Sequence, residues 1–356
     1  MSRFAVYVRV FCFCSDLPRP RKSQIAVEAT PYYHCVSRCV RRAFLCGEDR
    51  YTGRSYDHRR AFIEEELLRL GQVFYLDVVA YAVMSNHYHV VLFIDTESQK
   101  KADPKVIVTR WHELHKGNAV SVKYLEGDYL EPHEIKQLNT YVDKWREQLA
   151  SISWYMRVLN EKVARMANIE DDVTGRFWEG RFKCQALLDE KALLSCMAYV
   201  DLNPVRSTLA ATPEDSEHTS IRHRVKHWKA HSERSNQQKN SNAKGHSFQP
   251  ANLHPFVGNQ REGMPTGIVF SLVDYLQLVD WTGRQIRDDK VGSIDVGAEP
   301  ILKRLSISPE HWVYLCTHFE SQFKGLVGSV HSLKAACAHF GRQRIPNAGK
   351  SILVFG

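Results

Sequence analysis

One stretch decides the fold of this chain: residues 82–94 read AVMSNHYHVVLFI. Its last five residues, Val90 to Ile94, are apolar and mostly β-branched or aromatic, which is typical of a buried strand. Side chains two residues apart on a strand point to the same face, so we expect the imidazoles of His87 and His89 to lie side by side. Two imidazoles in this arrangement suit two ligands of one divalent metal ion. Tyr88 alternates with them, and we expect it to be packed on the opposite face of the strand.

The composition is that of a globular protein with room for two domains. The chain has 356 residues, of which 44% are hydrophobic and 25% are charged. The formal net charge of +8 suits a polyanionic partner such as nucleic acid, although many proteins without such a partner share it. Nine cysteines without zinc-site spacing indicate reduced thiols in a cytoplasmic protein. No apolar run approaches the roughly 20 residues that cross a bilayer, so we expect no membrane partner.

Changes in composition divide the chain into four parts. Residues 1–18 are predicted to be an N-terminal extension and not a signal peptide, because Arg9 interrupts the apolar run. Residues 19–228 form the main domain. Residues 229–252 are rich in Ser, Asn, Gln, Lys and His and are predicted to be a flexible linker. Residues 253–356 regain hydrophobic periodicity and are predicted to form a small, mainly helical domain, whose docking position the sequence leaves open.

Within the main domain, strands and helices alternate. The two-residue Ser85-Asn86 connection between apolar runs indicates an antiparallel hairpin. Gly71 is predicted to end the first helix. The succession β-α-β-β-α-β-α predicts an α+β fold with helices packed on an antiparallel sheet. The predicted strands are 32–38, 74–84, 87–95 and 176–188, and the predicted helices are 57–70, 152–167 and 190–203, with a mostly helical insert at about 101–149.

A second candidate group lies near the end of the last of these helices. Tyr199 and Asn203 are four residues apart and so occupy one helix face. Pro204 disfavours helical geometry in the residue before it, which predicts that the helix ends at Asn203 with its amide free to face a site. A capping asparagine and a packed tyrosine would have the same pattern. Together with the histidine pair, however, the amide oxygen completes a three-ligand site suited to Mg²⁺ or Mn²⁺, and the phenol would reach a phosphate held there.

These motifs resemble the HUH superfamily, here with tyrosine between the two histidines. They are most similar to its single-tyrosine transposases, above all the REP-associated tyrosine transposases. The resemblance covers roughly residues 20–206, while the insert and everything after residue 229 depart from the compact members. It rests on the histidine pair and on three further segments: 32–38 (YYHCVSR), 175–182 (GRFWEGRF) and 199–205 (YVDLNPV).

The resemblance implies a ferredoxin-like fold that cleaves single-stranded DNA beside a hairpin in DNA transposition. Tyr199 becomes the nucleophile, which retains the 5′ phosphate. His87, His89 and Asn203 become ligands of Mg²⁺ or Mn²⁺. We also expect a cytoplasmic, nucleoid-associated protein that acts as a monomer or a homodimer.

Basic residues fit a DNA partner in two places. The first group, near the N-terminus, is predicted to contact phosphates, and the second mixes cations with an aromatic ring, which is typical of surfaces that stack unpaired bases. A solvated surface and a core strand are the respective alternatives. The first group is Arg19, Arg21, Lys22, Arg38, Arg41 and Arg42, and the second is Arg176, Trp178, Arg181 and Lys183.

Three other functions stay open at this point. The chain could be a domesticated regulator that binds DNA hairpins without cleaving them. It could also be an HUH replication initiator, although many of these place two tyrosines on the helix. A metallohydrolase of small phosphoesters would need neither Tyr199 nor the basic surface.

Overall fold

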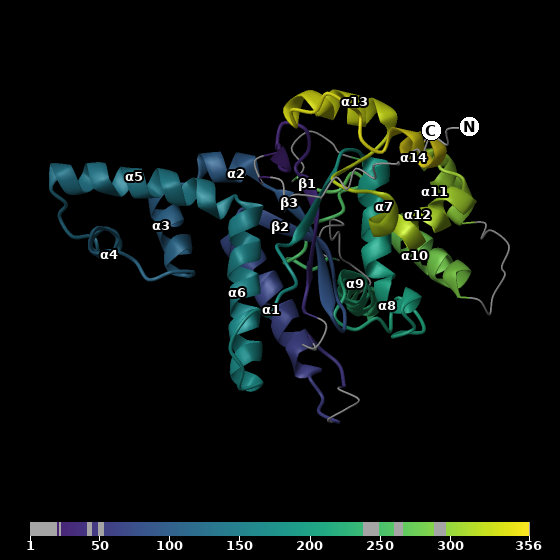
Figure 1. Ribbon diagram of the computed structural model, residues 1–356, viewed down its shortest axis with the longest axis horizontal. Helices are drawn as coiled ribbons and strands as arrows, with labels where there is room; N and C mark the ends of the chain where they lie inside the picture. The colour runs from purple at the N-terminus through teal and green to yellow at the C-terminus, as the bar shows by residue number, and fades with distance from the viewer. Residues whose placement is uncertain are drawn as a thin grey trace, which may run out of the picture.

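A five-stranded mixed sheet lies at the centre of the protein (Figure 1). The computed structural model describes residues 20, 23–40, 45–48, 53–237, 249–259, 266–287 and 297–355. The strands are β1 (Tyr32–Arg38), β2 (Leu76–Val83), β3 (His87–Ile94), β4 (Lys183–Leu187) and β5 (Leu326–Val327), in the spatial order β2-β3-β1-β4-β5. The α+β class is therefore confirmed.

The sheet departs from the expected ferredoxin-like antiparallel one at its edge. Neighbouring strands from β2 to β4 are antiparallel, but β5 pairs in parallel with β4. The expectation of a purely antiparallel sheet is wrong because β5 comes from the C-terminal segment, where Leu326 and Val327 lie in an otherwise helical region.

The last predicted strand, 176–188, is also too long. Only Lys183–Leu187 forms β4. Ahead of it, the Arg176 guanidinium donates hydrogen bonds to the carbonyls of Trp178 and Glu179 and so closes a turn. The aromatic residues of this segment thus lie in a loop, so their side chains do not alternate between two faces as they would in a strand.

Helices cover both faces of the sheet, and each face has its own hydrophobic core. On one face, α1 (His58–Val73) and α6 (Ile152–Glu170) pack over a core that includes Tyr88. On the other face, α7 (Glu190–Asp201) packs with helices from the end of the chain over a core that includes Tyr199. These C-terminal helices are α10 (Leu272–Ile286), α11 (Ala298–Leu305), α12 (Pro309–Gln322) and α14 (Ala348–Phe355), and α13 (Val330–His339) follows β5.

Two predicted boundaries differ from the observed ones. Helix α1 continues through Gly71 to Val73. The glycine does not end the helix but permits close packing, since a Cβ there would lie 3.0 Å from Val78 Cγ2. The predicted linker 229–252 begins inside α9 (Ser220–Gln237), which extends through Lys229 and Ala230, both good helix formers. Residues 238–248 of that linker, and the extension 1–18, lie outside the described residues.

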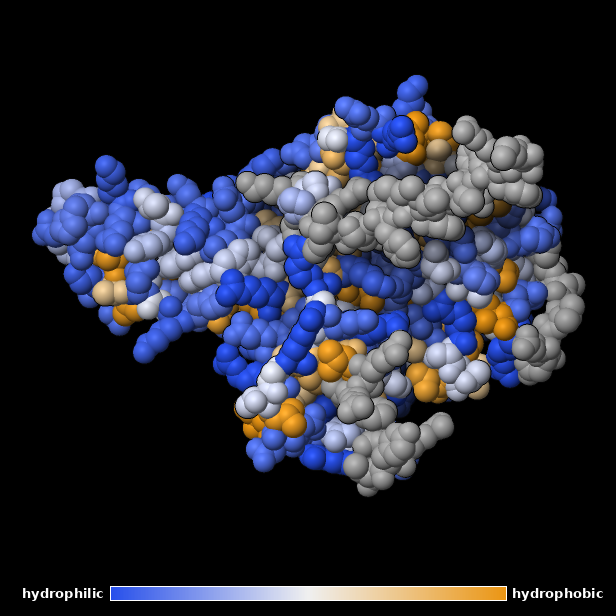
Figure 2. Space-filling model, viewed as in Figure 1, coloured by the Kyte–Doolittle hydropathy of each residue, from blue (hydrophilic) through white to orange (hydrophobic). Residues whose placement is uncertain are grey.

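The insert forms a helical arm that projects from the sheet (Figure 1). It follows α2 (Thr96–Lys101) and consists of α3 (Pro104–His112), α4 (Ala119–Glu126) and α5 (Pro132–Leu149). Trp111 and Trp145 stack with ring centroids 5.4 Å apart and hold α3 against α5. The face of the arm visible in Figure 2 is mostly hydrophilic, in keeping with its exposed position.

None of the helices in the described ranges combines the length and apolar character needed to cross a membrane. The described cysteines are all free thiols.

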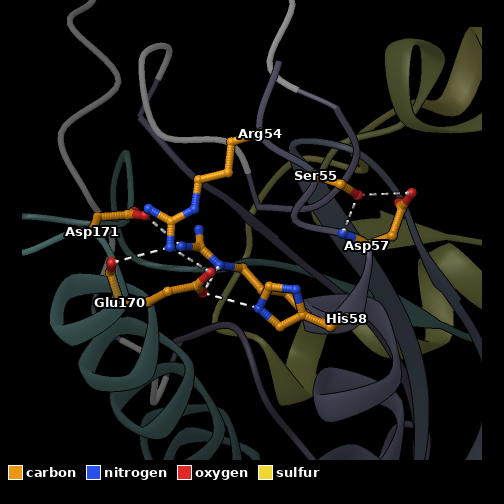
Figure 3. A network of polar contacts seen from close by, with 7 residues as sticks. Arg54, Ser55, Asp57, His58, Glu170 and Asp171 are labelled. Atoms are coloured by element: carbon orange, nitrogen blue, oxygen red, sulfur yellow. Dashed lines mark hydrogen bonds and ion pairs between the residues drawn. The ribbon is translucent and has the colours of Figure 1, made fainter. Parts of the chain in front are cut away.

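A buried arginine joins α1 to α6 on the face opposite α7. Arg59 donates through Nε to Glu170 Oε2 at 2.7 Å and through Nη2 to Asp171 Oδ1 at 2.6 Å. Arg54 and His58 also approach Glu170, so that three basic side chains converge on the end of α6 (Figure 3).

We expect Arg59→Met to lower the free energy of unfolding by about 2 to 3 kcal/mol, which urea denaturation would measure. The Arg59 side chain is fully buried, while the two carboxylates are each 20% exposed, so water compensates part of the loss. Arg165→Met is the matched control, because its pair with Glu161 is exposed and should contribute about 0.5 kcal/mol or less. Equal effects of the two substitutions would contradict the structural role of Arg59.

Candidate active site

The two histidines of β3 lie side by side on the face that α7 covers. The ring centroids of His87 and His89 are 4.8 Å apart, and the rings are nearly perpendicular. Tyr88 lies on the opposite face, where its hydroxyl donates to Asn160 Oδ1. The strand alternation predicted for these three residues is confirmed.

Tyr199 and Asn203 approach the same imidazole. The Tyr199 ring lies edge-on to His89 with centroids 5.7 Å apart, and Asn203 Nδ2 lies 2.8 Å from His89 Nε2. The predicted helix boundary is off by two residues, because α7 ends at Asp201 and Asn203 begins the short helix α8 (Asn203–Arg206) with Pro204 in its first turn. Proline is favoured at that position, since it has no amide hydrogen to leave unpaired. The structure thus brings together all four residues that the sequence singles out.

The amide of Asn203 is turned away from a ligand orientation. Its nitrogen, an obligatory donor, faces His89 Nε2, so that ring nitrogen carries the lone pair. A metal ion would need the same lone pair, and it would need the Asn203 oxygen instead of the nitrogen. Metal binding therefore requires the amide to release His89 and rotate.

The donor set otherwise fits a divalent ion. The candidate site has two histidines and one asparagine, so it is not a group of three or more His, Cys, Asp or Glu side chains. No group of that kind in the described ranges is arranged to hold a metal. Two imidazoles, one rotated amide and water molecules would form the mixed nitrogen and oxygen set that Mn²⁺ accepts readily and Mg²⁺ less so.

Burial keeps both imidazoles neutral. It lowers the pKa of His87 to about 4, with the nearby Arg38 guanidinium acting in the same direction. It also lowers the pKa of His89 well below its usual range, and His87 adds to the shift. Neutral imidazole is the form that binds metal, so the pair is ready to act as ligands at neutral pH.

Tyr199 is covered by the C-terminal segment. Tyr199 is 6% exposed, and the centroid of its ring lies 5.9 Å from the centroid of the Phe319 ring on α12. The Arg206 guanidinium lies 4.1 Å from the Tyr199 ring centroid and donates to the Thr317 carbonyl of α12. Burial raises the pKa of Tyr199, although Arg206 opposes the shift, so the phenol is protonated in this arrangement.

Sequence reasoning missed three polar residues here. His34 of β1 stacks on His89, Arg206 lies over Tyr199, and Glu320 of α12 accepts a hydrogen bond from Lys183 at 2.9 Å. Burial alone would raise the pKa of Glu320, but the hydrogen bond and the charge of Lys183 lower it overall. His34 is the one with a sequence signal, since it lies in an apolar strand within the YYHCVSR segment.

A cavity of about 620 Å³ borders this site. His34 and Glu320 line it together with three cations, Lys183, Lys324 and Arg342. Three cations around one carboxylate make the cavity a suitable surface for phosphate groups.

Of the residues predicted to contact DNA, some are exposed near the site, some have structural roles, and the rest lie outside the described residues. Arg38 and Lys183 are exposed at the ends of β1 and β4, beside the site, and Arg181 is exposed in the preceding loop. Arg176 closes the turn described above, and Trp178 donates from Nε1 to the Asn160 carbonyl at 2.8 Å, so both have structural roles. The remaining predicted contacts, Arg19, Arg21, Lys22, Arg41 and Arg42, lie outside the described residues.

No protein-family model and no curated protein matches this chain significantly. Among solved structures, it is similar to one described as a REP-associated tyrosine transposase bound to a REP hairpin. The two chains are 11% identical, with a TM-score of 0.33, over 64% of this chain and 86% of that chain. Any function proposed for this chain therefore depends on its own residues.

Proposed function

We propose that this protein is a metal-dependent single-stranded DNA endonuclease and strand transferase, which cuts near hairpin elements in DNA transposition. One observation carries the proposal: a tyrosine and an asparagine one helical turn apart both approach His89, which lies beside His87. A metal site with an adjacent nucleophile requires this convergence on paired neutral imidazoles, whereas a structural tyrosine and a capping asparagine do not. The arrangement combines a metal-ligand set with a nucleophile.

Each residue has a definite task in this proposal. His87, His89 and the rotated amide of Asn203 would hold Mg²⁺ or Mn²⁺, and the ion would supply Lewis-acid polarisation of the scissile phosphate. Tyr199 Oη forms a bond to phosphorus as the bond from phosphorus to the 3′ oxygen breaks. The phenolic proton passes to solvent, and solvent returns a proton to the 3′ oxygen, which leaves as a hydroxyl. Arg206 opposes the raised pKa of Tyr199 and favours loss of that proton. The 5′-phosphotyrosine retains the energy of the phosphodiester bond for rejoining.

DNA must gain access to Tyr199 for this reaction. Besides the apolar packing of α12 on α7, three contacts hold α12 next to the tyrosine: the Phe319 ring, the hydrogen bond from Arg206 to Thr317, and the pair of Lys183 with Glu320. Both basic residues would also bind phosphate well, so an incoming DNA strand competes for them. We therefore expect α12 to shift when the substrate binds.

The direct test is trapping of the covalent intermediate. Purified protein is mixed with Mn²⁺ and labelled single strands that contain a hairpin with single-stranded flanks, and adducts are resolved on a denaturing gel. We expect an adduct that chelation of the metal prevents and that fully duplex DNA does not give. Failure to form an adduct with a hairpin library under Mg²⁺ and Mn²⁺ would refute the cleavage proposal.

A second candidate is a hairpin-binding regulator that does not cleave. The burial of Tyr199 and the amide of Asn203 on His89 favour it, since both describe a closed site. Tight hairpin binding that is independent of divalent ions, without any adduct, would support this function instead.

Removal of charge beside the site should weaken DNA binding in a salt-dependent way. We expect Arg38→Gln and Lys183→Gln each to reduce the slope of log affinity against log salt by about one. Lys123→Gln, on the helical arm, is the matched control and should leave the slope unchanged. Fluorescence anisotropy of a labelled hairpin over a salt series measures the slopes. Slopes for Arg38→Gln and Lys183→Gln equal to that of the unmodified protein would exclude this surface.

A further inference from the structure

We propose that Gln185 and His34 are positioning residues that fix the tautomer of His89, so that its Nε2 lone pair points into the site. The inference deepens the proposed function and rests on it, since it assigns to these two residues the orientation of a metal ligand. Neither residue touches the position of the metal itself; each acts through the next.

A chain of four hydrogen bonds carries the inference. Gln185 Nε2 donates to the Phe323 carbonyl at 2.5 Å, and Gln185 Oε1 lies 2.7 Å from His34 Nδ1. His34 Nε2 lies 3.0 Å from His89 Nδ1, and His89 Nε2 lies 2.8 Å from Asn203 Nδ2. All four side chains are buried.

The backbone carbonyl at one end sets the direction of the whole chain. A carbonyl only accepts hydrogen bonds, so the Gln185 amide nitrogen must face Phe323 and its oxygen must face His34. His34 therefore donates from Nδ1 and accepts at Nε2, which requires His89 to donate from Nδ1. At the other end, the Asn203 amide nitrogen, which only donates, faces His89 Nε2, so this nitrogen carries the lone pair and is the one that faces the site.

The two histidines reach the same tautomer by different means. His87 Nδ1 lies 2.6 Å from Asn86 Oδ1, a side chain on the adjacent turn that is exposed. Both rings thus present Nε2, but His89 depends on a buried chain that ends on the C-terminal segment. Phe323 directly follows α12, so the segment that covers Tyr199 also orients a ligand.

The consequence is a supporting layer around one ligand. Metal-bound histidines commonly donate their second ring N–H to a neighbouring group, and loss of that group typically lowers metal affinity about 10- to 100-fold. Here the neighbouring group is another histidine, which is itself held by an amide.

The first measurement uses metal-free protein labelled with ¹⁵N-histidine. We expect the ring-nitrogen spectrum to show His89 protonated at Nδ1 and unprotonated at Nε2. His34→Leu and Gln185→Met should each alter this state, because each removes an acceptor. His34→Gln should preserve it, since the new oxygen can accept from His89 while its nitrogen donates to Gln185.

The second measurement is Mn²⁺ affinity by calorimetry, with the metal alone as the probe. We expect His34→Leu and Gln185→Met to bind Mn²⁺ about 10- to 100-fold more weakly than the unmodified protein, and His34→Gln to recover most of the loss. Gln249→Met is the matched control. Gln249 also forms hydrogen bonds to a backbone through both of its amide atoms, with the carbonyl and the N–H of Phe256. It takes no part in the series of hydrogen bonds from Phe323 to Asn203.

The outcomes separate this inference from the proposed function. An Nε2-protonated His89 in the unmodified protein, or a tautomer that both His34→Leu and Gln185→Met leave unchanged, would overturn the inference. The expected tautomer in a protein that binds no Mn²⁺ would instead refute the metal site. If His34→Leu does not fold, Gln185→Met and His34→Gln still decide the question.

Discussion

Tyr199→Phe should abolish the covalent protein–DNA adduct, with cleavage reduced on the order of 10³-fold or more, because phenylalanine has no oxygen to attack phosphorus. The Tyr199 ring contacts His89, Phe319 and Arg206, and phenylalanine keeps that packing. Hairpin binding is therefore expected to change little. A denaturing gel with labelled hairpin DNA and Mn²⁺ measures the adduct, and fluorescence anisotropy measures the binding.

The matched control for this prediction is Tyr314→Phe. Tyr314 lies on α12, is partly exposed and stacks on His318, away from the histidine pair. It should form the adduct at the rate of the unmodified protein. Adduct formation by Tyr199→Phe at that same rate would remove Tyr199 from the mechanism.

Asp201→Ala should lower the free energy of unfolding by about 3 to 5 kcal/mol, because it leaves three buried donors without their acceptor and a buried cation without its nearby counter-charge. The fully buried Asp201 carboxylate accepts hydrogen bonds from the Ser220 hydroxyl, the Ile221 amide and the Tyr275 hydroxyl. It also acts electrostatically on the buried Arg224 guanidinium. Urea denaturation at pH 7 measures the loss.

Asp280→Ala is the control for this substitution. Its partner Arg284 is one turn away on an exposed helix face, so the loss should be about 0.5 kcal/mol or less. A similarly small loss for Asp201→Ala would mean that Asp201 does not join α7 to α9 and α10.

The pH dependence of Asp201 gives a second readout. Burial raises the pKa of Asp201 to about 6, although its hydrogen bonds oppose the shift. Since the folded pKa exceeds the unfolded one, this group contributes most stability below about pH 4 and loses that contribution as the pH rises through 6. The stability difference between the unmodified protein and Asp201→Asn should therefore be larger at pH 4 than at pH 7.

Local patterns in the sequence were sufficient to predict the central hairpin and the histidine pair. Alternation along β3 determines that His87 and His89 share a face, because side-chain direction in a strand follows residue number alone. The four-residue spacing of Tyr199 and Asn203 likewise predicts that they point to the same side, and both approach His89, although Asn203 begins α8 and does not end α7. Both features depend on backbone periodicity, which neighbouring elements do not alter.

Boundaries and turns were predicted less well. Gly71 has the sequence signal of a helix end, yet it permits close packing on Val78. The segment before β4 reads as a strand, yet the Arg176 side chain folds back on its own backbone. In each case a contact that the sequence does not display decides the outcome.

What the sequence by itself determined is which side chains close in sequence point together: the imidazole pair of β3, and the Tyr199 phenol and Asn203 amide on either side of the junction between α7 and α8. Only the tertiary structure decided that α12 covers Tyr199, that β5 extends the sheet in parallel, and that Gln185 and His34 hold His89 in one tautomer. The physical reason is the range of the interactions. Periodicity acts over neighbouring residues, whereas the hydrogen bond from Gln185 to the Phe323 carbonyl joins residues 138 apart, and it exists only once the C-terminal segment is packed against the sheet.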